Sequence, residues 1–135
     1  GGNLGRRMLL RVEDVMHTGG EIPVVREEDT VKDAILEMTS KRFGATCVVN
    51  RKGELVGIFT DGDLRRVVEK TPDVLSLKAK DVASPNPKVI SKEALAARAL
   101  NLMEYFNITC LLITDKEKKP VGIVHLHDLL KAGVV

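Results

Sequence analysis

Two stretches of this sequence repeat each other, in the same order, at a fixed distance along the chain. Residues 57–64 read GIFTDGDL and residues 122–129 read GIVHLHDL. The offset is 122 − 57 = 65 residues, and upstream it also places Met38 on Met103. Two copies of one unit, each with an uncovered apolar face, are expected to bury those faces against each other. The cleft between them is then the expected place for a ligand.

The composition is that of a globular protein. Hydrophobic residues make up 44% of the 135 residues and charged residues 30%, which argues against disorder. Each copy is roughly 60 residues long, near the lower limit for folding alone, so we expect the two to form one cooperative unit. A net charge of +2 and an aromatic content of 3% disfavour nucleic-acid binding, which needs a basic surface or stacking aromatics.

We expect a cytoplasmic protein without a membrane partner. No apolar run approaches the roughly 20 residues that span a bilayer, and no signal peptide is recognisable. Cys47 and Cys110 lie in apolar runs outside any CxxC pair. We therefore predict buried free thiols rather than a disulfide or a metal site.

Hydrophobic periodicity in the first copy predicts strand, helix, strand, strand, helix. Thr30 and Asp33 have the spacing of a helix capping box, and the helix after them carries an apolar stripe typical of one buried face: Val31, Ala34, Ile35 and Met38. Gly44 is the expected end of that helix. The other expected elements are strands at 24–25, 46–49 and 55–59, a turn at 50–53, and a helix from Thr60 or Asp61 to about Lys70 with Leu64, Val67 and Val68 inside.

The second copy shows the same order of elements. We expect a strand at 89–90, a helix from Ser91 to about Phe106, strands at 110–114 and 121–124 around a turn, and a helix to Lys131. Residues 71–80 are a polar connector. The predicted boundaries are 1–11 for a tag remnant and linker, 12–72 for the first repeat and 78–135 for the second.

Two tandem units of this kind, each with a glycine and an aspartate at a strand-to-helix junction, resemble a pair of cystathionine-β-synthase (CBS) domains. The resemblance covers nearly the whole chain. It implies an α/β (α+β) fold of two tandem strand-helix-strand-strand-helix CBS repeats related by pseudo-twofold symmetry.

Three segments resemble the C-terminal part of bacterial arabinose-5-phosphate isomerases more narrowly: residues 9–19 (LLRVEDVMHTG), 57–66 (GIFTDGDLRR) and 125–135 (HLHDLLKAGVV). In that family an N-terminal sugar-isomerase domain interconverts ribulose 5-phosphate and arabinose 5-phosphate on the way to Kdo for lipopolysaccharide. Nothing in this chain resembles that domain. The resemblance therefore implies a non-catalytic regulatory fragment whose partner is the missing isomerase domain.

Thr60 and Asp63 are the strongest chemical signal in the sequence. A helix that begins after a strand presents free N–H groups and a favourable dipole to an anion, and the Thr60 hydroxyl adds a phosphate contact. The resemblance to CBS domains gives Asp63 the role of accepting hydrogen bonds from ribose hydroxyls, and Asp61 belongs to the same predicted site. The alternative is that Thr60 and Asp63 are helix caps only.

Two further segments are candidates for the ligand site. By resemblance, His17 and Thr18 line a base pocket together with Ile22, Pro23 and Val24; the alternative is an ordinary loop and core packing. Arg65, like its neighbour Arg66, is suited to bind phosphate or carboxylate in a bidentate manner, or else belongs to a solvated helix face.

The second copy departs from the pattern, because His125 replaces the threonine while Asp128 is retained. We therefore expect one occupied site, with His125 and His127 reaching the acidic part of the ligand across the cleft. A metal site at His125, His127 and Asp128 is disfavoured, because no further ligand cluster is visible.

The leading functional hypothesis is a ligand-sensing regulatory module without a metal or a catalytic cofactor. The resemblance makes CMP-Kdo or CMP the expected feedback ligand, with AMP or ATP as the alternative. A purely structural oligomerisation module is a second hypothesis. An isomerase activity of the fragment itself is the least favoured, because only its histidines could act as bases near neutral pH. A homodimer through the helices is expected, with Ala96, Ala97 and Ala99 permitting close approach.

Overall fold

The computed structural model describes residues 9–134 of the chain. The first repeat folds in the predicted order: β1 (Val24–Arg26), α3 (Val31–Lys41), β2 (Ala45–Val49), β3 (Leu55–Thr60) and α4 (Asp61–Lys70). The second repeat contains α6 (Ala96–Phe106), β5 (Cys110–Thr114), β6 (Pro120–His125) and α7 (Leu126–Lys131). Short elements precede each repeat: α2 (Val12–Val15) and η1 (Gly19–Glu21) before the first, and η2 (Val74–Ser76), α5 (Ala79–Val82) and β4 (Ser84–Pro85) before the second.

The two sheets share one register. In the first sheet, of order β1-β2-β3-β4, β1 runs parallel to β2 and Cys47 lies opposite Ile58 on the antiparallel β3. In the second sheet Leu112 on β5 lies opposite Ile123 on β6. Each member of the second pair follows its counterpart by the repeat offset, which confirms the predicted duplication of the fold.

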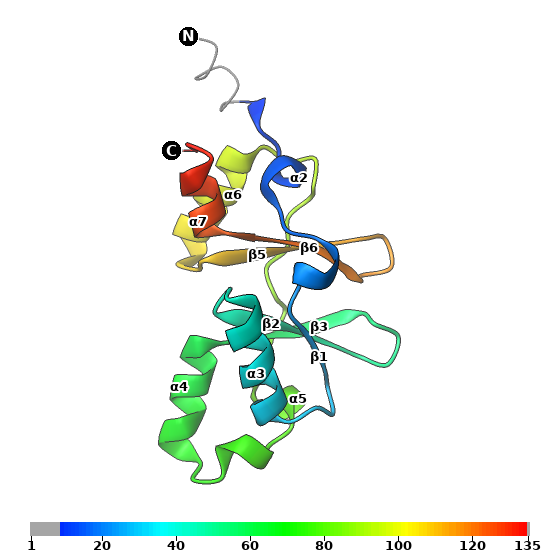
Figure 1. Ribbon diagram of the computed structural model, residues 1–135, viewed down its shortest axis with the longest axis vertical. Helices are drawn as coiled ribbons and strands as arrows, with labels where there is room; N and C mark the ends of the chain where they lie inside the picture. Colours follow the sequence, from blue (N-terminus) through cyan, green and yellow to red (C-terminus); the bar gives the residue numbers. More distant parts are fainter. Residues whose placement is uncertain (1–8, 135) are drawn as a thin grey trace.

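The sheets lie at the middle of the molecule and most of the helices lie toward its two ends (Figure 1). Each repeat has its own core, and a third cluster of buried side chains joins the two sheets: Ile22, Phe43, Cys47, Cys110, Leu112 and Ile123. The two cysteines are free and buried, as predicted. Burial raises the pKa of each thiol to about 12, so both remain protonated at neutral pH.

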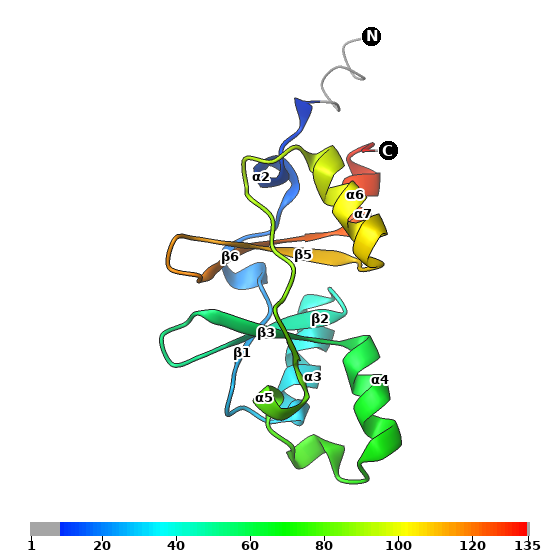
Figure 2. The same ribbon diagram turned by 180° about the vertical axis from the view of Figure 1, so that it is seen from behind.

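The repeats exchange their leading segments, the short stretches that precede each repeat in the chain: each segment packs against the other repeat. Val12 of α2 is fully buried in the core of the second repeat, and its N–H donates to the Ala94 carbonyl at 2.8 Å. Ala79 of α5 is fully buried in the core of the first repeat, and its N–H donates to the Asp29 carbonyl at 2.7 Å. Figures 1 and 2 show α2 beside α6, and α5 beside α3. The two repeats are therefore interlocked rather than merely adjacent.

Some predicted elements differ from the structure. The expected strand at 89–90 is reduced to a single bridge between Val89 and Leu112. Helix α6 begins at Ala96 rather than Ser91, because Ser91 accepts from the Glu93 N–H and closes a turn instead. The equivalent of Thr30 is Leu95, which starts α6 without any side-chain cap.

Three smaller predictions were also wrong. Helix α3 ends before Gly44, because Arg42 already adopts the left-handed conformation (φ 68°) at its C-cap. Val68 is 53% exposed and not on the inner face of α4. The polar connector at 71–80 includes η2 and the start of α5, whose Ala79 belongs to the first core.

The N-terminal prediction is tested only in part. The predicted tag remnant at residues 1–3 lies outside the described residues. Leu10 and Arg11 already contact the second repeat through the Ala96 N–H and the Glu93 carbonyl. Within residues 9–134 no helix is long and apolar enough to cross a membrane.

Candidate functional site

A cavity of about 1020 Å³ lies between the two repeats. Five segments line it: the loop after α3, the β3–α4 junction, residues 84–88, residues 107–110, and the start of α7. The structure therefore brings together six residues that the sequence predicts for the site: Thr60, Asp61, Asp63, Arg65, His125 and His127.

Thr60 and Asp63 form a complete capping box at the start of α4. The Thr60 Oγ1 accepts from the Asp63 N–H at 3.2 Å, and Asp63 Oδ2 accepts from the Thr60 N–H and hydroxyl, both at 3.0 Å. This arrangement satisfies donors that the first turn of a helix leaves free. The predicted capping role of both residues is therefore present in the structure.

The second oxygen of Asp63 is also occupied. Arg66 Nη2 and Ser84 Oγ donate to Asp63 Oδ1 at 2.7 and 2.8 Å. Asp63 is only 7% exposed, whereas the Arg66 side chain is 66% exposed. A ligand hydroxyl that reaches this carboxylate must therefore replace Ser84 or the largely exposed Arg66.

The walls of the cavity carry more positive than negative charge. Asp61 and Asp63 are its carboxylates, whereas its basic side chains are Arg42, Arg65, Arg66 and Lys88. Asp61 is fixed at the entrance to α4, since its N–H donates to the Gly44 carbonyl at 3.1 Å. Such a field favours an anionic ligand, and arginine side chains bind phosphate and carboxylate groups in a bidentate manner.

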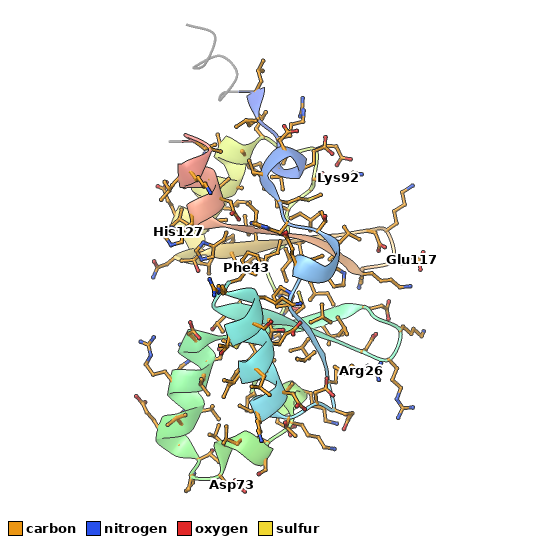
Figure 3. All side chains as sticks on the ribbon, in the orientation of Figure 1. Arg26, Phe43, Asp73, Lys92, Glu117 and His127 are labelled. Carbon is orange, nitrogen blue, oxygen red and sulfur yellow. The ribbon has the colours of Figure 1, made fainter. Side chains whose placement is uncertain are left out.

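His125 and His127 form a stacked pair on the opposite wall. Their ring centroids are 4.8 Å apart with an interplanar angle of 15°, and His125 Nδ1 accepts from the His127 N–H at 3.0 Å. Burial, together with the nearby His127, lowers the pKa of His125. Figure 3 shows His127 on the upper repeat and Phe43 at the junction between the repeats.

Asp128, the counterpart of Asp63, has different partners. It accepts from the His125 N–H at 2.8 Å, and its Oδ1 lies 2.8 Å from His17 Nε2. The other nitrogen of His17 lies 2.7 Å from a Glu21 carboxylate oxygen. Partial burial opposes the imidazolium, but the hydrogen bonds to Asp128 and Glu21 outweigh it and raise the pKa of His17.

The remaining predicted residues lie away from the cavity. His17 contacts Asp128, Thr18 is exposed before η1, and Ile22 is buried between the sheets. The Pro23 carbonyl accepts from the Cys47 N–H, and the Val24 N–H donates to Glu37. None of these five residues lines the cavity beside Thr60.

Residues 84–88 occupy the place predicted for that segment, because the leading segments are exchanged. The sequence carries a signal for them. Asp81-Val82 matches Asp14-Val15 at an offset of 81 − 14 = 67 residues, and this offset carries His17 onto Ser84. Both residues bind the aspartate of the other repeat.

Across residues 9–134, no group of three or more His, Cys, Asp or Glu side chains is arranged to hold a metal ion. In the disfavoured set of His125, His127 and Asp128, several of the potential ligand atoms are engaged in hydrogen bonds. His125 uses Nδ1 to accept from the His127 backbone, and both carboxylate oxygens of Asp128 have partners. The described arrangement serves capping and hydrogen bonding.

The chain resembles bacterial isomerases in sequence. It is 46% identical over 135 residues to arabinose 5-phosphate isomerase KdsD of Pseudomonas aeruginosa and 47% identical over 135 residues to KdsD of Escherichia coli K12. The match covers the whole of this chain but only 41% of the length of those relatives.

Solved structures share the fold. A protein from Pyrococcus horikoshii is 26% identical with a TM-score of 0.79, covering 93% of each chain. CBSX2 in complex with AMP is 23% identical with a TM-score of 0.77, covering 92% of this chain and 96% of that one. The protein-family model of the CBS domain matches this chain twice, at residues 12–70 and at residues 79–135. The chain therefore belongs to the CBS-domain family and consists of two tandem copies of that domain.

Proposed function

We propose that this CBS pair is the ligand-sensing regulatory module of an arabinose-5-phosphate isomerase and that it binds a cytidine nucleotide such as CMP-Kdo or CMP. The observation that carries the proposal is the cavity between the repeats, where Thr60 and Asp63 of one copy face His125 and His127 of the other. Its volume of about 1020 Å³ suits a nucleotide. The identity to KdsD over the whole chain supports the isomerase as the parent protein.

Each part of the ligand has a chemically matched wall in this proposal. The phosphate lies at the start of α4, near the Thr60 hydroxyl and Arg65. The ribose hydroxyls donate to Asp63 in place of Ser84 or Arg66. His125 and His127 face the phosphate from the opposite wall, and the sugar carboxylate of CMP-Kdo adds a second anionic group for the basic side chains of the cavity.

The base contacts follow from the exchanged segments. Residues 84–88 line the cavity, so we assign to them the base pocket that was predicted at His17, Thr18, Ile22, Pro23 and Val24. Pro85 and Pro87 present compact apolar rings to a planar base.

Calorimetric titration of the purified chain with CMP, CMP-Kdo, AMP and ATP tests the proposal. We expect CMP-Kdo to bind more tightly than CMP, since only the former carries a carboxylate in addition to its phosphate, and both to bind more tightly than AMP. Failure of all four to bind contradicts a nucleotide-sensing role.

Adenine nucleotides are the second candidate ligand. Structures of the same fold contain AMP or other adenosine derivatives: CBSX2 was solved with AMP, and the CBS pair of MJ0100, 17% identical with a TM-score of 0.81, was solved with 5′-methylthioadenosine and S-adenosylmethionine. Tighter binding of AMP or ATP than of CMP would favour this candidate.

A structural module is the third candidate, and the satisfied hydrogen bonds of Asp63 support it. Asp63→Ala separates it from the sensor. If Asp63 only caps α4, the variant is less stable but binds any nucleotide as the wild type does. If Asp63 holds the ribose, the variant loses nucleotide binding at a temperature where it is still folded.

The proposed partners are an isomerase domain of the same protein and a second copy of the chain, in the cytoplasm. Ala96 and Ala99 are fully buried within their own repeat, so the predicted close approach through these two residues is wrong. For Ala97, which is half-buried, it stays a prediction. A homodimer would instead use the exposed apolar residues of the helices: Leu36, Val68, Tyr105 and Leu130.

A further inference from the structure

The stacked histidines of the second repeat have unequal roles that their hydrogen bonds define. Nδ1 of His125 accepts from the His127 N–H at 3.0 Å, so this nitrogen carries no proton. A neutral imidazole has its one proton on the other nitrogen, and His125 is therefore a donor through Nε2. Protonation of His125 would place a hydrogen on Nδ1 and break the cap of α7.

The stacking itself opposes a second positive charge. The ring centroids are 4.8 Å apart, a distance at which two imidazolium ions repel each other. The lowered pKa of His125 agrees with this, since burial and the proximity of His127 are its two main causes. Nδ1 of His125 is committed to the cap of α7, whereas the ring of His127 is the more exposed of the two.

The charged groups around the pair are of both signs. Asp128 is bonded to the His125 N–H and to His17, which favours the positive form of His17. The ring of Phe43 lies 6.4 Å from that of His125. The charged side chains that line the same cavity from the other segments are Arg42, Asp61, Asp63, Arg65, Arg66 and Lys88.

We infer that binding of a phosphate- or carboxylate-bearing nucleotide in this cavity is linked to the uptake of a proton from solvent by the His125–His127 pair. His127 holds the proton and His125 donates through Nε2 to the same anionic group. The inference rests on the proposed function and adds to it a protonation-dependent affinity. An anion beside the pair offsets the repulsion that opposes protonation in the free protein.

Titration calorimetry at pH 7.5 in two buffers of different ionisation enthalpy measures the protons taken up per ligand. The probe is CMP, and AMP if CMP does not bind. At this pH the phosphate is almost wholly dianionic, because its second pKa is about 6. We expect proton uptake by the wild type, none by His127→Asn, and roughly tenfold weaker binding to that variant, the effect of one lost charge-assisted hydrogen bond.

Two controls isolate the anion. Cytidine, or adenosine in the AMP experiment, lacks the phosphate and should bind the wild type and His127→Asn equally. His125→Thr restores the residue type of the first repeat and keeps a helix cap, so its melting temperature shows whether the helix is intact while its affinity reports the lost Nε2 donor.

The outcomes are distinct. Nucleotide binding without proton uptake, or with the same uptake in His127→Asn, overturns the inference and leaves the proposed function in place. Absence of binding by all four nucleotides, CMP, CMP-Kdo, AMP and ATP, overturns both. Proton uptake that is lost in His127→Asn supports the inference.

Discussion

Asp63 and Asp128 occupy equivalent positions in the two repeats and cap equivalent helices, but they are held by different chemistry. Ser84 and Arg66 bind Asp63 with a neutral donor and a permanent cation. His17, itself bonded to Glu21, binds Asp128 with a group that titrates near neutral pH. The duplication has preserved the capping geometry, while the residue delivered by the exchanged segment has diverged. One site is therefore expected to be insensitive to pH and the other sensitive.

The largest effect is expected from removing the two aspartates. Asp63→Ala should lower the free energy of unfolding by about 2–3 kcal/mol, because it removes a helix cap and leaves Ser84 without its acceptor. This loss should be the same at pH 6 and pH 8. Asp128→Ala should cost less at pH 8 than at pH 6. Urea denaturation at both pH values measures the losses, and an equal pH dependence of the two variants would contradict the comparison.

A smaller effect is expected at the equivalent glycines, where the exchanged segments approach the sheets. A Cβ on Gly57 would lie 3.1 Å from the Ser84 backbone oxygen, whereas one on Gly122 would lie 2.6 Å from the Met16 sulfur. A flexible side chain yields more readily than backbone. We expect Gly57→Ala to cost about 2 kcal/mol and Gly122→Ala about 1 kcal/mol.

Thermal unfolding of these two variants and of Gly122→Ala with Met16→Ala measures this difference. The double variant should recover part of the loss, because it shortens the side chain that the new Cβ meets. Ala83 is the counterpart of Met16 beside Gly57 of the first repeat. A greater loss for Gly122→Ala than for Gly57→Ala would show that the Met16 segment is the more rigid of the two.

The pH dependence of stability should reveal His17. Its pKa is raised in the folded protein, so its contribution is fully present below the unfolded pKa near 6.5 and is lost as the pH rises through the folded pKa. His17→Ser, which installs the residue of the first repeat, should cost about 0.5–1 kcal/mol at pH 6 and little at pH 8.5. Melting temperatures between pH 5.5 and 8.5 measure it; a constant difference would contradict the assignment.

The smallest effect is expected for His125, and it has the opposite sign. Its pKa is lowered in the folded protein, so the unfolded chain binds the proton more readily and stability is lost as the pH falls below about 6.5. Relative to the wild type, His125→Thr should therefore gain stability at pH 5.5, by about 0.5 kcal/mol. The same melting series tests this. If the stability change of His125→Thr varied with pH in the same direction as that of His17→Ser, the opposite pKa shifts of the two histidines would be contradicted.

Much of the fold could be predicted from single residues and their spacing. The capping box of Thr30 and Asp33 and that of Thr60 and Asp63 both start helices as expected, because a cap is a contact between neighbours in sequence. The start of α6 was missed because Leu95 has no capping side chain. In such a helix the first turn is fixed by packing, which a local pattern does not contain.

The candidate site was predicted only in part, again because a local sequence pattern does not contain long-range packing. Thr60 and His125 end strands that pair in a repeated register, and Asp63 lies in the helix turn after Thr60, so the duplication itself brings them to one cleft. Ser84 and residues 85–88 were missed because they belong by sequence to one repeat and by contact to the other.

The repeat by itself determined that the chain forms two like units with one register and two capped helices facing each other, since alternation and capping act over a few residues. The tertiary structure alone decided which side chain each aspartate receives. Ser84 meets Asp63 across 21 residues and His17 meets Asp128 across 111. Such contacts depend on how the leading segments pack across the two cores, and burial of apolar faces is not directional.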